Sequence, residues 1–283
     1  MVPSPRSSPT TGLLWPGGPA VGRLALGGAP FGGLYQPMSA AQVAAVVDAA
    51  WAQGIRYFDT APRYGDGVSE SLIGRALRGR PRAELVLSTK VGWRFTAGRW
   101  VADFTADGIR RSLEQSMQRL GLDRIDIAYL HDPDDHREQA LDEAYPALRE
   151  LREQGVLRAI GLGVNWPGLP AWFVQRADLD VVLLAGRYTV LDRSAEEEML
   201  PLCLERGVAV VAAAVFNSGI LVDPSPGARF DYRPAEPEML ARAQRLQTIC
   251  GRFGVELPAA ALQFPMRHPA VRSESTRLNS SHI

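Results

Sequence analysis

Residues Arg56–Glu70 read RYFDTAPRYGDGVSE, and the fold prediction rests first on this stretch. Aromatic and β-favouring residues lead into Asp59, where strand character stops. A turn rich in Pro and Gly then carries Tyr64, and Ser69 is predicted to open a helix. A strand that ends in a polar residue and feeds a loop commonly holds functional groups. Taken alone, the same residues also fit a turn capped by Asp59, with Tyr64 packed at a rim.

Two further polar residues end apolar runs in the same way. Lys90 ends LVLSTK and is the single lysine of the chain, because every other one of the 31 basic residues is an arginine. A compact ammonium whose pKa can be tuned does what a guanidinium cannot, so a retained lysine indicates a specific role. His131 ends IDIAYLH. Asp59, Lys90 and His131 thus mark the ends of three predicted strands, each separated from the next by a helical pattern.

The whole chain alternates strand-like and helix-like segments. Ser39 and Thr105 stand where helix N-caps belong, and Gly54, Gly121 and Gly207 follow helices as C′ residues. Strands are predicted at Val21–Gly27, Arg56–Thr60, Leu85–Val91, Ile125–His131, Leu157–Val164, Asp180–Ala185 and Val208–Phe216. Helices are predicted at Ala40–Gln53, Ser69–Leu77, Thr105–Leu120, Glu138–Gln154, Leu169–Arg176 and Ala195–Glu205. This alternation predicts a parallel sheet within one α/β domain.

A closed (β/α)8 barrel, or TIM barrel, fits better than an open doubly wound sheet. The first strand is followed by GGAPFGG at 27–33, where Pro30 and the late cap at Ser39 do not suit a dinucleotide-binding turn. Polar candidates instead follow successive strands, ending with Asn165 after the fifth. A barrel gathers such strand ends around one mouth, whereas an open sheet spreads them out.

Composition narrows the function classes. The chain has 283 residues, 46% hydrophobic and 22% charged, with a formal net charge of +0. This balance offers no electrostatic case for a nucleic-acid partner or an acidic membrane surface, and the longest apolar run is too short to cross a bilayer. Cys203 and Cys250 lack metal-ligand spacing, and we interpret them as buried, reduced thiols of a cytoplasmic protein.

The candidate residues share one kind of chemistry. A neighbouring ammonium lowers the pKa of a tyrosine and prepares it for proton transfer, while a carboxylate holds the buried ammonium in place. A histidine can donate a hydrogen bond to a carbonyl oxygen. Such a set protonates a carbonyl or deprotonates an alcohol while a nicotinamide cofactor carries the hydride, which no side chain can supply.

Several motifs together resemble one family. FDTA at 58–61 with Tyr64, SESLIG at 69–74, STK at 88–90, LGLDRID at 120–126 and His131 closely resemble the aldo-keto reductases over about Val21 to Val271. The resemblance implies an oxidoreductase that uses NAD or NADP on a small aldehyde or sugar. It implies Tyr64 as proton donor or acceptor, Asp59 and Lys90 as the residues that tune it, and His131 as the residue that orients the substrate oxygen.

The resemblance also implies a cofactor site. Asn165 would hold the nicotinamide carboxamide, and the backbone N–H groups after the seventh strand would wrap the pyrophosphate. The aromatic that stacks on the nicotinamide in many members is replaced by Ala213, which leaves Tyr188 as its candidate substitute. The complete expected set of cofactor contacts is Gly28, Ala29, Asp59, Asn165, Tyr188, Asn217, Ser218, Gly219 and Leu221.

The segments at 29–30, 185–189 and 215–219 look most like the branch that oxidises sugars at C1 or pyridoxal. Trp93 and Trp100 in the Gly92–Asp103 loop, together with Trp166, are our candidates for the substrate pocket wall; simple rim packing is the alternative. No metal site is expected.

The two ends of the chain depart from the pattern. Residues 1–20 are expected to form a flexible leader, with a hairpin that could cover one end of the domain, and residues 21–271 the barrel. Residues 272–283, RSESTRLNSSHI, have no apolar period and look like a foreign tail on a truncated frame. The eighth βα unit is therefore expected to be incomplete, with an open seam between the seventh and first strands.

Three other functional interpretations stay open at this point. A metal-dependent barrel hydrolase could use Asp59, His131, Asp132 and His136, although four histidines in the chain are few for one. A non-catalytic nucleotide-binding regulator would bind cofactor without turnover. An inactive truncated fragment would lack the grip on the adenosine phosphate.

Overall fold

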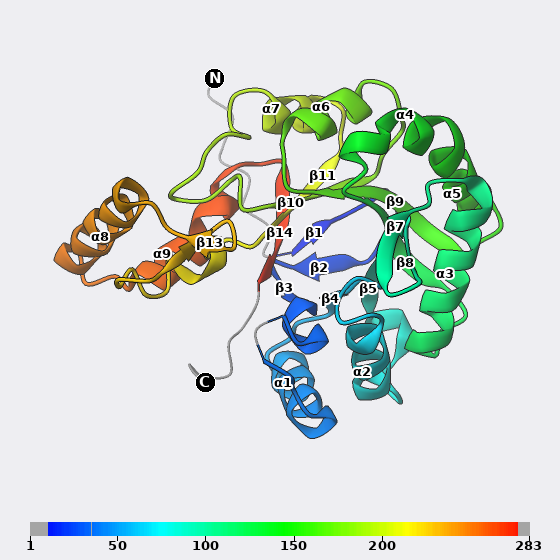
Figure 1. The fold of residues 1–283 in the computed structure, drawn as a ribbon, viewed down its shortest axis with the longest axis horizontal. Coiled ribbons are helices and arrows are strands. Elements are labelled where there is room, and N and C mark those ends of the chain that lie inside the picture. Colours follow the sequence, from blue (N-terminus) through cyan, green and yellow to red (C-terminus); the bar gives the residue numbers. More distant parts are fainter. Residues whose placement is uncertain (1–10, 35, 277–283) are drawn as a thin grey trace, which may run out of the picture.

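Eight parallel strands close into a barrel in the computed structural model, which describes residues 11–34 and 36–276 (Figure 1). The expected (β/α)8 class is therefore confirmed. In order around the barrel the strands are β3 (Leu24–Gly27), β4 (Tyr57–Asp59), β5 (Val86–Val91), β8 (Ile125–His131), β9 (Leu157–Val164), β10 (Val181–Ala185), β11 (Ala209–Ala213) and β14 (Val271–Thr276).

Helices surround this barrel and bury its outer face. Most coincide with the predicted segments: α1 (Ala40–Ala52), α2 (Val68–Leu77), α3 (Ala106–Leu120), α6 (Gly168–Val174) and α7 (Met199–Glu205). The predicted helix at 138–154 consists of a short α4 (Arg137–Gln139), a π-helical turn (Ala140–Ala144) and α5 (Tyr145–Glu153). Short 3-10 turns lie at Ala29–Gly32, Arg82–Glu84, Asp134–His136, Asn217–Gly219 and Phe264–Arg267.

The predicted caps explain where several helices begin and end. Ser39 and Gln42 form a capping box, with the Ser39 hydroxyl accepting from the Gln42 N–H at 3.3 Å. The Thr105 hydroxyl accepts from the Gly108 N–H at 3.0 Å. Helix α2, however, begins at Val68 after Gly67, and not at Ser69. The Ser69 hydroxyl lies in the first turn of the helix and donates to the Gly28 carbonyl oxygen at 2.8 Å.

The N-terminal end of the barrel is closed by a hairpin of β1 (Thr11–Leu13) and β2 (Ala20–Gly22), which lies across the centre of Figure 1. Leu14, Trp15 and Val21 are buried against the interior side chains Val86 and Ile127. The expected hairpin is thus present. The part of the expected flexible leader from 11 to 20 is instead packed, because these apolar side chains fill the barrel end. Residues 1–10 of the leader lie outside the described residues.

The expected open seam between the seventh and first strands is wrong. Strand β14 pairs with β11 on one side and with β3 on the other, and the expected limit of the barrel at residue 271 falls inside it. Its polar residues are accommodated because the strand is paired along both edges and Ser273 donates its hydroxyl to the Gly22 carbonyl oxygen at 3.2 Å. Residues 277–283 of the expected foreign tail lie outside the described residues.

Two helices that the sequence analysis does not predict stand beside the barrel at the left of Figure 1. They are α8 (Pro237–Arg252) and α9 (Leu257–Gln263), and they bury Leu221 and Ile220 against Ala243 and Leu257. The expected loop at 92–103 also contains a hairpin, β6 (Trp93–Thr96) with β7 (Arg99–Ala102), and a second hairpin pairs β12 (Arg229–Phe230) with β13 (Arg233–Pro234).

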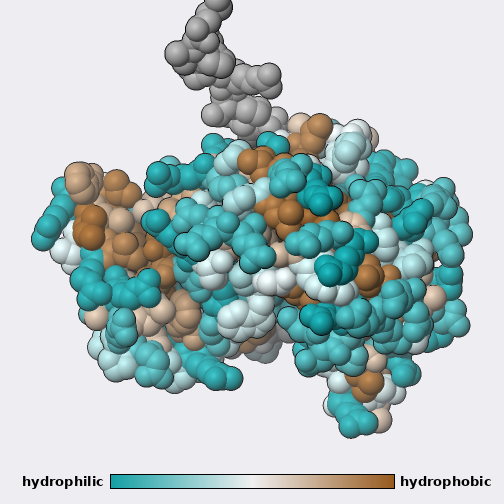
Figure 2. Space-filling view, turned by 90° about the horizontal axis from the view of Figure 1, so that it is seen from above, coloured by the Kyte–Doolittle hydropathy of each residue, from teal (hydrophilic) through white to brown (hydrophobic). Residues whose placement is uncertain are grey.

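Hydrophobic surface gathers at the left edge of the molecule, over α8 (Figure 2). It includes Ile249, Phe253 and Val255, which are 49%, 80% and 41% exposed. Of the two cysteines, Cys203 is buried and Cys250 half-buried, and both are free thiols. Burial raises the pKa of Cys203 to about 12. Within 11–34 and 36–276, no helix has the length and apolar character needed to cross a membrane.

Candidate active site

The structure brings Asp59, Tyr64, Lys90 and His131 together at the C-terminal mouth of the barrel. Asp59, Lys90 and His131 stand at or near the carboxyl ends of β4, β5 and β8, three neighbouring strands, and Tyr64 lies in the loop after β4. Because parallel strands in a barrel end at one face, residues far apart in the sequence meet there. The spatial gathering expected from the strand ends is present.

Lys90 and Asp59 form a buried ion pair. Lys90 Nζ lies 2.7 Å from Asp59 Oδ2 and also donates to the Thr60 carbonyl oxygen at 2.9 Å. The two side chains are only 2% and 5% exposed, so each charge depends on the other to offset its loss of hydration. Burial by itself lowers the pKa of Lys90, but Asp59 and Tyr64 outweigh it and raise that pKa above its ordinary value. Lys90 is therefore a fixed positive charge.

Tyr64 stands over this charge. Lys90 Nζ lies 4.6 Å from the centre of the Tyr64 ring, and the ring meets His131 edge-on with centroids 6.3 Å apart. Burial raises the pKa of Tyr64, the Lys90 charge opposes this effect, and the net pKa is above the ordinary value. Near neutral pH the phenol thus holds its proton, beside a cation that stabilises the phenolate once the proton has left.

His131 is a neutral imidazole near pH 7. Burial lowers its pKa well below the ordinary value, and the positive charges of Lys90 and Arg63 lower it further. Its Nε2 lies 3.7 Å from Asp132 Oδ2. A neutral imidazole has one N–H to donate, so His131 can offer a hydrogen bond to a substrate oxygen without adding a charge.

Asn165 and Asn217, two of the predicted cofactor contacts, follow strands β9 and β11 at the carboxyl ends of the barrel strands. Asn165 donates its side-chain amide to Asp132 Oδ1 at 3.0 Å, next to His131. Asn217 donates to the Gly186 carbonyl oxygen at 3.0 Å, while its buried Oδ1 has no hydrogen-bond partner among the described residues. A buried acceptor without a donor is costly, so its presence fits a ligand that brings an N–H or O–H group.

The loop predicted to bind the pyrophosphate makes hydrogen bonds within its own turn. The backbone N–H groups of Asn217, Gly219 and Leu221 donate to the carbonyl oxygens of Ala214 and Phe216. The Leu221 side chain is buried against α8 and α9, and the Ser218 hydroxyl accepts from the Tyr232 N–H at 2.9 Å. The N–H groups of Asn217, Gly219 and Leu221 are thus bonded within the turn in this structure, and the wrapping of the pyrophosphate by this loop stays a prediction.

Gly28 and Ala29 follow strand β3 and lie next to Asp59, and their contact with a cofactor stays a prediction. The Gly28 N–H donates to the Asp59 carbonyl oxygen at 2.7 Å, and Ala29 begins the 3-10 turn that follows. A Cβ atom on Gly28 would lie 2.7 Å from both Ser69 Oγ and Ile73 Cδ1. Only glycine lets this backbone lie so close to α2.

Tyr188, the expected nicotinamide-stacking ring, packs against two other aromatic rings, and its stacking role stays a prediction. Its ring packs against Phe264 at 5.2 Å and His268 at 6.1 Å between centroids. Only 5% of the residue is exposed. The ring is therefore part of the hydrophobic core.

The three tryptophans of the expected pocket wall have different settings. Trp93 donates its indole N–H to the His131 carbonyl oxygen at 2.6 Å and carries the Arg63 guanidinium 4.5 Å over its ring. Trp166 is 57% exposed and also faces a guanidinium. Trp100 packs on Phe95 within the β6–β7 hairpin, at 5.4 Å. Trp93 is thus hydrogen-bonded to the strand end that carries His131, and the role of all three tryptophans in a pocket wall stays a prediction.

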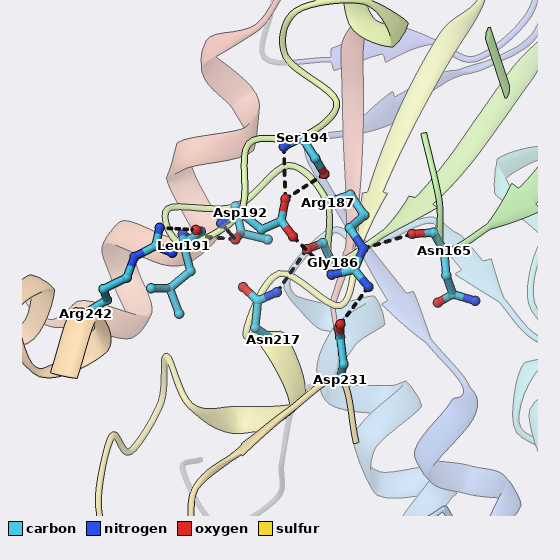
Figure 3. A network of polar contacts seen from close by, with 10 residues as sticks. Asn165, Gly186, Arg187, Leu191, Asp192, Ser194, Asn217, Asp231 and Arg242 are labelled. Carbon is cyan, nitrogen blue, oxygen red and sulfur yellow. Dashed lines mark hydrogen bonds and ion pairs between the residues drawn. The ribbon is translucent and has the colours of Figure 1, made fainter. Parts of the chain in front are cut away.

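Sequence reasoning assigns no role to Arg187, which the structure places at the centre of a polar network (Figure 3). Its guanidinium donates to the Asn165 carbonyl oxygen at 3.1 Å, to Asp192 at 3.0 Å and to Asp231 at 2.7 Å. Arg187 thereby joins the loop after β9 to the β12–β13 hairpin. The sequence contains one signal for this network: Arg187 stands between a glycine and a tyrosine at a strand end. An arginine that is buried at such a place requires acidic partners.

The described part of the chain contains no group of three or more His, Cys, Asp or Glu side chains arranged to hold a metal ion. The hydrolase interpretation would require such a group.

Comparison with known proteins agrees with this geometry. A family model described as the aldo/keto reductase family matches residues 23–274. The chain is 43% identical over 279 residues to D-threo-aldose 1-dehydrogenase of Pseudomonas sp and 45% identical over 292 residues to pyridoxal 4-dehydrogenase of Microbacterium luteolum. Each match covers 90% of this chain and 85% of the relative. The holo form of aldo-keto reductase AKR11C1 from Bacillus halodurans superposes with a TM-score of 0.78 at 28% identity, covering 91% of this chain and 82% of that one.

Proposed function

The chain belongs to the aldo/keto reductase family. We propose that it oxidises an aldose at its C1 hydroxyl, or a pyridoxal-like aldehyde, and that it also catalyses the reverse reduction. In this proposal Tyr64 is the general acid and base. As a member of this family it is an NAD(P)-dependent oxidoreductase. The substrate proposal is supported by the names of the two relatives above 40% identity, an aldose 1-dehydrogenase and a pyridoxal 4-dehydrogenase.

One observation carries the proposed roles of the side chains. The Lys90 ammonium is locked onto Asp59 at 2.7 Å and lies 4.6 Å from the Tyr64 ring centre. A phenolate that forms at Tyr64 is stabilised by this fixed charge, so the residue can give up and recover a proton during turnover. A regulator that only binds nucleotide would not need such a set, which makes the regulatory alternative less favoured.

The bound nicotinamide would accept or supply the hydride. The chain's own residues then handle the proton and the orientation. Tyr64 donates its proton to a carbonyl oxygen in reduction and takes it from a hydroxyl in oxidation. His131, neutral at pH 7, donates a hydrogen bond to the same oxygen, and Asn165 and the unpaired Asn217 Oδ1 are the groups we expect to hold the cofactor.

Turnover of purified protein tests this function. We would follow the near-ultraviolet absorbance of reduced nicotinamide with L-fucose, D-arabinose or pyridoxal and with either NAD or NADP. Tyr64→Phe should lower kcat by about 10²–10⁴-fold, the usual contribution of a general acid or base. Tyr145→Phe is the matched control, since the Tyr145 hydroxyl bonds only to the backbone of Asp178.

Two outcomes would contradict the proposal. Equal turnover in wild type and Tyr64→Phe would remove the tyrosine from the mechanism. Tight binding of NAD or NADP without turnover of any of the three substrates would contradict the proposed substrates.

A further inference from the structure

Three buried hydroxyl groups lie directly beneath the Asp59–Lys90 pair, inside the barrel. Ser88 Oγ lies 2.6 Å from Asp59 Oδ1 and 3.2 Å from the Tyr57 hydroxyl oxygen, and the Tyr57 and Tyr129 hydroxyls are 2.9 Å apart. Ser88, Tyr57 and Tyr129 have no exposed surface. They therefore form a continuous chain of hydrogen bonds from β8 through β4 and β5 to the carboxylate.

The direction of the hydrogen bond to Asp59 follows from counting protons. An ionised carboxylate only accepts, and Ser88 has one proton, so the short contact with Asp59 uses it. The Ser88 hydroxyl also donates toward the Tyr57 oxygen at 3.2 Å, but its shorter contact with the charged Asp59 is the stronger one. Either tyrosine can donate in the Tyr57–Tyr129 bond. Burial raises the pKa of both tyrosines, so both keep their protons. The Ser88 hydroxyl dipole thus points toward Asp59, and Tyr57 and Tyr129 hold Ser88 from its other side.

The barrel makes room for these hydroxyl groups at Gly161 in β9. A Cβ atom on Gly161 in β9 would lie 2.4 Å from Tyr129 Cδ1 and 2.5 Å from its Cε1. Gly161 therefore leaves the space that the Tyr129 ring fills. Below the hydroxyls the interior is apolar and closed by the β1–β2 hairpin. Hydrogen bonds in such surroundings polarise one another and are stronger than in water.

We propose that Ser88 is a positioning residue whose hydrogen bond draws the negative charge of Asp59 away from Lys90 and Tyr64, and that Tyr57 and Tyr129 are positioning residues that fix the Ser88 hydroxyl. This inference rests on the proposed role of Tyr64. The Asp59 charge opposes ionisation of Tyr64, so withdrawing part of it leaves more of the Lys90 field to stabilise the phenolate. The other charged and titratable groups that face Tyr64 are His131, Arg63 and Asp132.

The test compares pH profiles of alcohol oxidation in Ser88→Ala, Tyr57→Phe and Tyr129→Phe with the wild type and with the control Tyr145→Phe. In oxidation Tyr64 must accept a proton, so a higher pKa moves the rise of kcat to higher pH. We expect a move of about half a pH unit or more in Ser88→Ala, with smaller moves in the same direction for Tyr57→Phe and Tyr129→Phe. Tyr145→Phe should keep the wild-type profile.

A second readout does not depend on turnover. The ultraviolet difference between each protein and its Tyr64→Phe counterpart follows the ionisation of Tyr64 itself during alkaline titration. If the pKa of Tyr64 rises in the same order among the variants, the inference is supported even when none of the chosen substrates reacts. In that case only the proposal about the substrates is contradicted. Lower thermal stability in all three variants with an unmoved Tyr64 titration would overturn it, because the hydroxyls would then serve packing alone.

Discussion

The two ends of the barrel interior are filled by different kinds of side chain. At the mouth, Asp59 and Lys90 bury paired charges under a half-exposed Tyr64. At the other end, Leu14, Trp15 and Val21 of the hairpin region close the interior with apolar side chains. Apolar burial stabilises the fold directly, whereas a buried ion pair gains little net stability over a hydrophobic pair of similar volume. The difference indicates that the mouth is built for chemistry and the hairpin end for stability.

Replacing Lys90 should have the largest effect, because it disturbs both chemistry and charge balance. Lys90→Met removes the cation beside Tyr64 and leaves Asp59 ionised without its partner. We expect kcat to fall by at least about 10²-fold and the free energy of unfolding to fall by about 3–5 kcal/mol. Activity assays and urea titration measure the two effects.

The double variant Lys90→Met/Asp59→Asn separates these effects. Removing the unpaired charge should restore part of the stability while kcat stays low. If activity returned together with stability, the mouth would contribute through folding alone, and the contrast between the two ends would be lost.

Replacing Trp15 should show the opposite pattern. Trp15 is 7% exposed at the hairpin end, and Trp15→Ala should cost about 3–5 kcal/mol of unfolding free energy through lost burial and the cavity left behind. At a temperature where the variant is still folded, kcat should remain within about two-fold of wild type. A much larger fall in kcat, with the fold intact by circular dichroism, would show that the hairpin end also controls the chemistry.

The pH dependence of stability sharpens the comparison at the mouth. The folded-state pKa of His131 lies well below its ordinary value, so below about pH 6.5 the unfolded chain binds a proton that the folded protein does not. Stability is therefore lost as pH falls, by up to about 1.4 kcal/mol per pH unit from this group. His131→Gln should remove that contribution, seen as a smaller difference between urea titrations at pH 7 and pH 5.5. An unchanged pH dependence in the variant would mean that His131 titrates normally.

Where strands are buried on both faces by apolar side chains, sequence alone locates them well. The predicted limits of β8 and β9 agree with the structure residue for residue, since both runs are largely apolar, with Asp126 and Arg158 as the charged exceptions, and have clear ends. The strand ends in turn predict that Asp59, Lys90 and His131 meet at one mouth.

Other features depend on contacts that no local pattern contains. The β14 segment VRSEST has no apolar alternation, and its position depends on pairing with β11 and β3, which are distant in sequence. Tyr188 follows a strand end like the active-site residues, yet packing against Phe264 turns it into the core. The contacts among the hydroxyls of Ser88, Tyr57 and Tyr129 likewise depend on distances between three strands.

The single lysine of this chain offers an experimental advantage. Protein produced with isotopically labelled lysine would carry one labelled side-chain ammonium, at Lys90, buried against Asp59. Every nitrogen signal from that label would come from the active-site mouth. Magnetic resonance could then follow the ion pair in the intact protein without assigning any other residue, as cofactor, substrate or pH is changed.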